Sequence, residues 1–265
     1  REDEIDAFKS EEYWHVFAHL EGASPPEFEA KLVKQGKNTL KIENQQQADS
    51  ILVSLQKSQF SVKSVATKER KKSAAPPFIT SKLQQASRSA VRRTMQIAQQ
   101  LYEGIELPGE GAVGLITYMR TDSTRVSEQA IEDVRGFIGK TYGDAFVPEA
   151  PNRYRTKKDA QDAHEAIRPT SMAHEPEAVR PHLTREQYYL YRLIWNRFVA
   201  SQMPQAIFDD TTVDVAAGDY VFRVKGSVPK FRGWMVAYDN TVDDNTKIPD
   251  TADKAGDAVA SVLPV

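Results

Sequence analysis

The chain has 265 residues, with 35 basic and 37 acidic side chains, a formal net charge of -2 and no cysteine. This length can bury one large core or two modest ones, and the lack of cysteine excludes a disulfide framework and a thiolate metal site within it. The chain has no apolar run long enough to cross a bilayer, and its beginning is unlike a secretory signal, so we expect a cytoplasmic protein without a membrane partner.

The N-terminal part is typical of a small sheet with one helix. Glycine and proline residues separate three strand-like segments, 13–20, 28–34 and 38–43. The segment 45–57 then has apolar residues at helical spacing, which predicts a helix.

Positive charge gathers between Lys63 and Arg93, where nine basic residues are opposed only by Glu69. A phosphate backbone would find a favourable surface here. The residues 68–72 alone are more typical of a solvated flexible loop, and 68–77 is predicted as a linker between domains.

A helix is predicted to follow from residue 91. Four residues at helical spacing mark one of its faces: Val91, Met95, Ala98 and Tyr102. Four polar residues form a stripe along it: Arg92, Gln96, Gln99 and Glu103. A nucleic-acid strand can lie along this stripe, although an ordinary solvated face gives the same pattern.

The segment 114–124 carries a tyrosine and then an arginine from an apolar, strand-like run into a polar turn. A phenol with a pKa of about 10 is a poor nucleophile at neutral pH unless a cation lies close. In an extended segment, residues i and i+2 point to the same side, so Tyr118 and Arg120 can reach one phosphate. Three polar residues complete the turn: Thr121, Asp122 and Ser123. A core tyrosine beside a solvated turn would give the same short pattern.

Two further helices have clear start signals. Ser127 is predicted to cap a helix with three inward residues, Ile131, Val134 and Ile138. Thr184 and Gln187 form a capping box before a second helix. Four aromatic residues of that helix are predicted core residues: Tyr188, Tyr191, Trp195 and Phe198.

The segment 159–168 is predicted as a short helix ended by Pro169, with Gln161, His164 and Arg168 on one face. Taken alone, His164 is more typical of a structural or surface histidine than of a catalytic one.

Alternating residues after Thr211 predict a hairpin with its turn at 217–219, and the segment 231–236 predicts another strand. Strands at both ends around a helical middle predict an α+β fold. A β-rich domain would be formed by 1–76 and 205–265, and a mainly helical domain, 77–204, would be inserted into it.

Four segments together resemble bacterial type IA DNA topoisomerases and keep the family's order: PFITSKLQQA at 77–86, RTM to LYE at 93–103, GLITYMRTDST at 114–124 and AHEAIRP at 163–169. The resemblance implies a β-rich arch domain that carries a helical domain with the nucleophile. It implies that Tyr118 attacks single-stranded DNA to form a 5'-phosphotyrosyl link, and that another strand passes through the gap before religation. Negatively supercoiled DNA would be relaxed without ATP, in the bacterial nucleoid.

The same resemblance implies roles for individual residues. Arg120 would neutralise the phosphate as charge builds on it, and His164 would position that phosphate. The residues implied as DNA contacts are Arg92, Arg93, Gln99, Glu103, Thr117, Thr121, Asp122, Ser123 and Arg168.

The chain departs from the family in two places. The family's Mg²⁺ site lies in a Toprim domain with an Asp-x-Asp-x-Asp run, and this chain has no such run. We therefore expect part of an enzyme, with no metal site of its own, that needs the remaining domains as partners and does not relax plasmids alone. The segment 87–91 is also shorter than is usual in the family, which has a Gly-Phe pair there.

The main alternative is a noncatalytic module that binds single-stranded DNA, with Tyr118 as a stacking platform. A tyrosine recombinase would need several catalytic Arg and His residues, and a relaxase would need a metal-binding His cluster. Neither pattern is present in the sequence.

Overall fold

The computed structural model describes residues 1–9, 11–22, 26–154 and 164–238. Contacts divide these residues into two compact units. The described residues of the first unit are 1–70 and 208–230, and those of the second unit are 71–207 and 231–238. The domain limits expected from the sequence, after residue 76 and before residue 205, fall a few residues inside the second unit.

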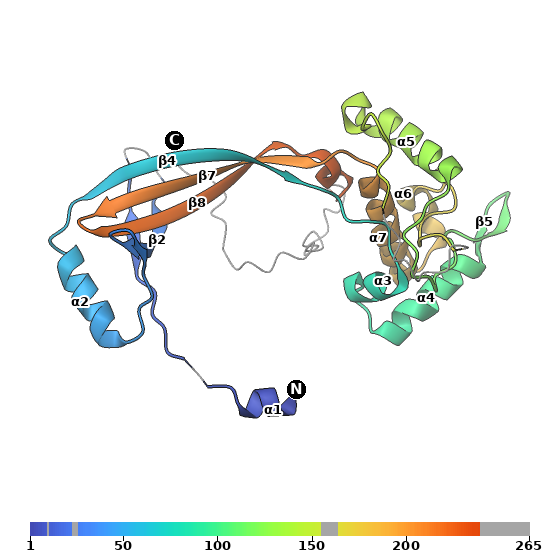
Figure 1. Cartoon of the computed structure of the whole chain (residues 1–265). Coiled ribbons are helices and arrows are strands. Elements are labelled where there is room, and N and C mark those ends of the chain that lie inside the picture. The colour runs from blue at the N-terminus through green and yellow to red at the C-terminus, as the bar shows by residue number, and fades with distance from the viewer. Residues whose placement is uncertain (10, 23–25, 155–163, 239–265) are drawn as a thin grey trace. The chain divides into compact units, whose positions relative to one another are not determined.

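The first unit is built on a sheet that joins strands from both parts of its chain. Its elements are α1 (Glu2–Asp6), β1 (Phe17–Leu20), β2 (Phe28–Gln35), β3 (Asn38–Thr39), α2 (Gln45–Leu55), β4 (Phe60–Lys72), β7 (Ala206–Ala217) and β8 (Tyr220–Phe231). The strand order is β1-β2-β8-β7-β4, and β3 pairs with β2. Figure 1 shows β4, β7 and β8 running side by side. The pairing of β2 with β8 confirms the α+β fold, with a sheet made from both ends of the chain.

One face of this sheet packs against α2. Ala48, Ile51 and Leu55 of the helix join a buried cluster with residues of β2, β7 and β8. Asn44 caps the helix by accepting a hydrogen bond from the Gln47 N–H at 2.9 Å. This confirms the predicted helix, although Leu52, a fourth apolar residue at helical spacing, is 45% exposed.

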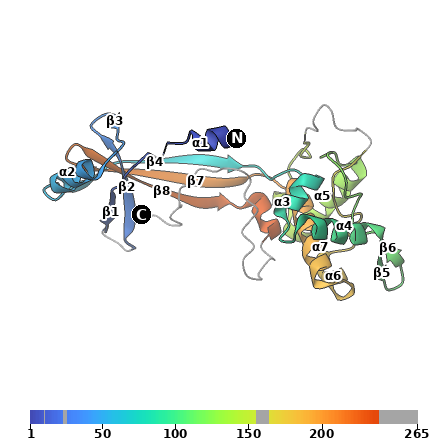
Figure 2. The same ribbon diagram turned by 90° about the horizontal axis from the view of Figure 1, so that it is seen from below.

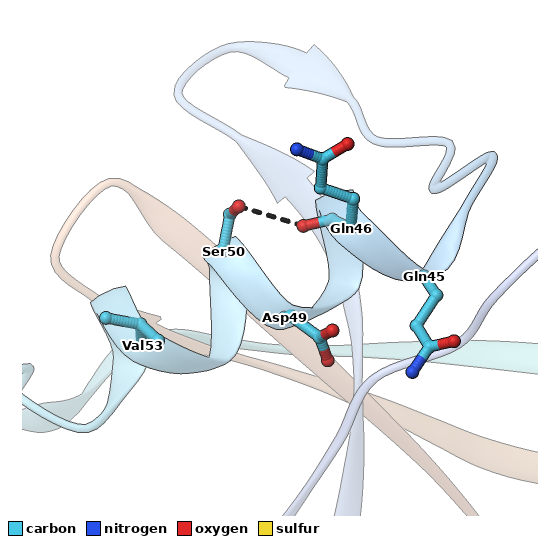
Figure 3. Close-up of a pocket in the computed structure, with 5 residues that line it drawn as sticks. All are labelled: Gln45, Gln46, Asp49, Ser50 and Val53. Atoms are coloured by element: carbon cyan, nitrogen blue, oxygen red, sulfur yellow. Dashed lines mark hydrogen bonds between the residues drawn. The ribbon is translucent and has the colours of Figure 1, made fainter.

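The opposite, outward face of α2 is mainly polar. A shallow pocket there is lined by Gln45, Gln46, Asp49, Ser50 and Val53 (Figure 3). The Ser50 hydroxyl donates to the Gln46 carbonyl at 2.8 Å. The Ser50 hydroxyl therefore makes its hydrogen bond within the helix and not toward a ligand. We interpret the pocket as a solvated helix surface.

The expectation of a flexible loop at residues 68–72 is wrong, because these residues form the end of β4. Exposed polar contacts hold this part of the strand. Thr67 and Thr211 hydroxyls lie 3.0 Å apart, and Arg70 donates from Nε to the Asp210 carboxylate at 2.5 Å. The basic side chains thus belong to a regular strand with partners on the neighbouring strand.

The second unit is mainly helical. Its elements are α3 (Thr80–Ala86), α4 (Val91–Glu103), β5 (Ile105–Leu107), β6 (Gly111–Val113), α5 (Glu128–Tyr142), the 3-10 helix η1 (Asp144–Phe146), α6 (Pro176–Val179), the 3-10 helix η2 (Arg180–His182), α7 (Arg185–Ser201) and the 3-10 helix η3 (Gly233–Tyr238). The helix α7 contacts α4, α6 and η3 and lies among them in Figure 2. Across the described ranges, no helix has both the length and the apolar character required to span a bilayer.

The start signals of the two long helices are confirmed. Thr184 and Gln187 form the expected capping box of α7, and the four predicted aromatic core residues of α7 are all buried. Ser127 caps α5 by accepting from the Ala130 N–H at 3.4 Å. A helix that is apolar on most sides must be surrounded by other elements, which explains the central place of α7.

Two predictions about elements of this unit are wrong. Residues 231–236 do not continue as a strand, because Gly233 has φ 49° and η3 begins there. An added Cβ at Gly233 would lie 2.5 Å from the Gln205 carbonyl oxygen. The described part of the predicted helix 159–168, residues 164–168, is extended, and residues 159–163 with Gln161 lie outside the described ranges.

The helix α4 also differs from the prediction in which face it buries. Its buried residues are Thr94, Ile97, Ala98 and Leu101. Val91 and Tyr102, which were expected on the apolar face, are 56% and 41% exposed. The apolar spacing predicted the wrong face because Thr94, a polar residue, is buried. Its hydroxyl donates to Ser87 Oγ at 2.8 Å. That bond also closes the short turn between α3 and α4.

Candidate active site

The Tyr118 segment begins as an extended chain fixed at its base by α4. The Leu115 N–H donates to the Leu101 carbonyl at 2.7 Å. Gly114 permits this approach, because an added Cβ would lie 2.6 Å from the Tyr102 carbonyl oxygen. The expected strand is present only as an isolated bridge between Ile116 and Pro169. The segment therefore depends on tertiary contacts for its shape.

The segment His164 to Thr170 supplies those contacts from the other side. The Thr117 N–H donates to the Arg168 carbonyl at 2.9 Å, and the Thr170 N–H donates to the Leu115 carbonyl at 3.1 Å. The Thr117 hydroxyl donates to the Ala166 carbonyl at 2.7 Å. These bonds require an extended chain at 164–168, which is the physical reason why this stretch is not helical.

Exposure alternates along the Tyr118 segment. Met119 is fully buried, and Thr121 and Ser123 are 7% and 1% exposed. Tyr118 is 43% exposed, and Arg120 and Asp122 are exposed as well. Since alternate residues of an extended chain share a side, the tyrosine, the arginine and the aspartate lie on the solvent side while their neighbours hold the chain in the core.

Thr80, the first residue of α3, holds the backbone on both sides of Arg120. Its N–H donates to the Thr121 carbonyl at 2.9 Å, and its hydroxyl accepts from the Thr121 N–H at 2.8 Å. The same hydroxyl lies 2.8 Å from the Met119 carbonyl oxygen, to which it donates. Sequence reasoning missed this residue, because a threonine at a helix start has no local sign of a partner 41 positions away.

Aromatic rings flank the exposed tyrosine. The Tyr118 ring centroid lies 5.5 Å from that of Tyr102 in an edge-on arrangement and 6.2 Å from the His164 ring. The structure thus brings His164 next to Tyr118, as the sequence pattern alone did not indicate. Tyr102 is a neighbour that was not among the expected site residues. Edge-on contacts of this kind restrict ring rotation while leaving the phenol oxygen accessible.

The residues expected to contact DNA differ in how buried they are and in whether they already bond to other residues. Thr121 and Ser123 are buried and bond within the turn, where the Ser123 N–H donates to Thr121 Oγ1 at 3.1 Å. In this structure their side chains do not face solvent, and their role as DNA contacts stays a prediction. Asp122 stays exposed, and Thr117 is half-buried with its hydroxyl bonded to the backbone.

Four of the remaining candidates already have protein partners: Arg168, Arg93, and Gln99 and Glu103, which bond to each other. Arg168 donates from Nε and Nη2 to the Glu165 carboxylate at 2.9 and 2.6 Å. Gln99 donates to Glu103 on the polar stripe of α4. Arg93 pairs with Glu186, which lowers the pKa of the glutamate and raises that of the arginine through the hydrogen bond.

The exposure of these ion pairs indicates how readily each candidate side chain could leave its protein partner and bind a phosphate instead. Arg92 is exposed. The pair of Arg93 and Glu186 is exposed on both sides, so it costs little to exchange for a phosphate. The pair of Arg168 and Glu165 is only 13% and 21% exposed and is expected to persist.

A buried cation lies beneath the same segment. The Arg197 guanidinium carbon is 4.5 Å from the centroid of the Phe78 ring, and Phe78 accepts a hydrogen bond from the Ile167 N–H at 2.8 Å. Burial lowers the pKa of Arg197 and raises the pKa of Tyr154 to about 12. Arginine keeps its charge despite such a shift, so Arg197 anchors the aromatic support of the His164 segment.

Metal ligands are not gathered in the part of the chain that the structure covers: no group of three or more His, Asp or Glu residues there could hold an ion.

An α+β chain with a fixed, exposed tyrosine beside an arginine and a histidine matches one class of enzyme. The family model described as DNA topoisomerase matches residues 1–262. The chain belongs to the DNA topoisomerase family.

Comparison with individual relatives assigns the chain to the type IA enzymes of this family. The chain is 46% identical over 256 residues to DNA topoisomerase 1 of Xylella fastidiosa strain 9a5c, covering 92% of this chain and 31% of the relative. It is 45% identical to DNA topoisomerase 1 of strain Temecula1, with the same coverage. Among solved structures, full-length topoisomerase I from Thermotoga maritima matches with a TM-score of 0.72 and 32% identity, over 94% of this chain and 39% of that one. The chain thus spans about a third of the length of these relatives.

Proposed function

We propose that the chain carries the nucleophile of a type IA topoisomerase and that Tyr118 is that nucleophile. The observation that carries the proposal is the fixed tyrosine, 43% exposed, between the half-buried Thr117 and the fully buried Met119 and beside Arg120 and His164. A nucleophile must be accessible and yet held in one place, and this segment combines both properties.

In the proposed reaction, the Tyr118 oxygen attacks a phosphodiester of single-stranded DNA. A bond forms between the phenol oxygen and phosphorus, and the bond from phosphorus to the 3'-oxygen breaks. The phenol loses its proton and the 3'-oxygen gains one, so the products are a 5'-phosphotyrosyl ester and a free 3'-hydroxyl. Religation is the reverse step, and no ATP is needed because the ester conserves the bond energy.

Arg120 would stabilise the charge that builds on the phosphate oxygens, the effect expected of a cation positioned in advance. His164 would position the phosphate from the other side of the tyrosine ring. Arg92 and Arg93, with the polar stripe of Gln99 and Glu103, would hold the strand along α4, and Asp122 and Arg168 would border it. The magnesium ion and the groups that move protons would come from another domain of the enzyme.

A covalent capture experiment tests the proposal. The chain is mixed with the metal-binding domain of the enzyme, magnesium and an end-labelled single-stranded oligonucleotide, then denatured, digested and mapped by mass spectrometry. We expect an adduct on Tyr118 that Tyr118→Phe abolishes and that Arg120→Ala reduces by about a hundredfold. The matched control is Tyr102→Phe, which removes a neighbouring phenol oxygen and should retain the adduct.

The chain by itself is expected to bind single-stranded DNA weakly and not to relax plasmids. Binding without any adduct in the reconstituted mixture would favour a noncatalytic binding module, with Tyr118 as a stacking residue. Relaxation of plasmids by the chain alone would contradict the need for another domain.

A further inference from the structure

An aromatic stripe runs along the edge strand of the first unit, and the catalytic proposal makes no use of it. It consists of Tyr13, His15 and Phe17, with Tyr13 66% and Phe17 44% exposed. His15 is exposed as well. Between them, Val16 is 7% exposed and joins the core on the other face. Tyr13 and His15 precede β1, and Trp14 between them is itself 38% exposed, so the three rings are exposed at the edge of the sheet while Val16 faces the core that α2 covers.

The rings of this stripe are close together but leave their faces free. The centroids of Tyr13 and His15 are 5.2 Å apart with an interplanar angle of 53°. Those of His15 and Phe17 are 6.2 Å apart at 76°. Since tilted and edge-on rings do not cover each other's faces, a planar group can stack on each of them.

Positive charge lies next to the stripe on the same side of the sheet. Lys31 is directly opposite Phe17 on β2, and its ammonium lies 3.4 Å from His15 Nε2. On its other side, Lys31 faces Arg223 of β8. A row of aromatic, lysine and arginine side chains thus crosses three neighbouring strands.

Carboxylates pair with part of this charge. Arg223 pairs with Asp214 at 2.7 and 2.8 Å, and these hydrogen bonds lower the pKa of Asp214. The charges of Lys34 and Lys63 lower this pKa further. At the far end of the row, His19 lies 3.8 Å from Glu29. Within the described residues, Lys31 has no carboxylate partner, and it is the positive charge that lies beside the aromatic rings.

Exposed aromatic rings next to cations form the usual platform for single-stranded nucleic acid, where bases stack and phosphates approach the charges. We propose that Tyr13, His15 and Phe17, with Lys31, form a second contact surface for single-stranded DNA. Bases would stack on the three rings, and Lys31 with Arg223 would lie near the phosphates. The proposal rests on the proposed function in one respect, since it takes single-stranded DNA as the substrate.

Affinity for a labelled 20-nucleotide oligothymidylate, measured by fluorescence anisotropy, tests this surface. We expect Phe17→Ala to weaken binding about tenfold and Phe17→Tyr to restore it, because tyrosine keeps a stacking face. The matched control is Phe8→Ala, a phenylalanine that is 78% exposed outside the stripe. Lys31→Gln should reduce the slope of log affinity against log salt by about 0.7.

Chemical protection of histidines tests the location. Diethylpyrocarbonate modifies exposed histidines, and mass spectrometry reads each position separately. The oligothymidylate should protect His15 but not His182, which is exposed in the other unit. A duplex of the same length should protect His15 much less, because its bases are already stacked.

The proposal is overturned if Phe17→Ala and Phe8→Ala bind equally well, or if duplex protects His15 as strongly as the single strand. It is also overturned if His15 is already protected in the whole enzyme without DNA, since another part of the protein would then cover the stripe. A failure of the catalytic proposal looks different: Tyr118 would give no adduct, while Phe17→Ala would still weaken binding.

Discussion

The strand β4 and the Tyr118 segment are both extended chains, yet they are held by opposite means. All residues of β4 except its last are exposed, and polar pairs such as Arg70 with Asp210 fix the strand. The Tyr118 segment is fixed by buried side chains such as Met119 and by backbone bonds to Thr80 and Arg168. Exposed ion pairs contribute little each and weaken in salt, whereas burial gives a position that solvent conditions scarcely change. We infer that the position of Tyr118 is fixed more firmly than that of β4, and that changes in sequence or solvent alter β4 more easily.

The largest predicted difference is in unfolding free energy, between truncating a buried side chain and truncating an exposed side chain of β4. Phe198→Ala removes a side chain that is 1% exposed on α7, and we expect a loss of about 4 kcal/mol in unfolding free energy. Val65→Ala on β4, where the side chain is 62% exposed, should change it by less than about 0.5 kcal/mol. Urea unfolding of both variants measures this. Equal losses would mean that β4 is buried in solution.

A smaller effect is expected at the base of the tyrosine segment. Gly114→Ala places a Cβ 2.6 Å from the Tyr102 carbonyl oxygen, so the backbone must shift at a cost of about 2 kcal/mol. Because the shift moves Tyr118, covalent capture at this proposed nucleophile should fall about tenfold or more.

The matched control for that change is Gly136→Ala in the middle of α5, where an added Cβ meets nothing within 4 Å. Alanine has the higher helix propensity, so this control should gain up to about 1 kcal/mol and keep full capture. Normal capture by Gly114→Ala would show that the segment tolerates displacement.

The smallest predicted effect concerns acid. Hydrogen bonds from Arg223 lower the folded pKa of Asp214 below its usual value, so the pair stabilises the fold above the unfolded aspartate pKa of about 3.9. This contribution, about 1 kcal/mol, is lost as the pH falls through the folded pKa. Thermal unfolding between pH 7 and pH 2.5 should therefore lose less stability in Asp214→Asn than in the wild type. An identical pH profile for both proteins would argue that the pair of Arg223 and Asp214 does not stabilise the fold.

The sequence predicted those features that depend on neighbours along the chain. The capping box of Thr184 and Gln187, the Ser127 cap and the buried aromatic residues of α7 all follow from short spacings, and all are confirmed. The alternation of Tyr118 and Arg120 on the solvent side is a property of extended backbone and was predictable in the same way.

What could not be predicted depends on residues far away in the chain. Residues 164–168 are extended because Thr117 and Arg125 bond to their backbone. Residues 68–72 form a strand because Asp210 and Thr211 lie beside them. Thr80 acts on a turn 41 positions later. Local patterns contain none of these partners.

The hairpin of β5 and β6 has a consequence for engineering. It lies between α4 and Leu115, and the bond from the Leu115 N–H to the Leu101 carbonyl closes the chain below it. We therefore expect that its length can change without moving the backbone at Tyr118. The turn at Pro108 and Gly109 offers a place to graft an epitope or a fluorophore that would report on the enzyme without touching its chemistry.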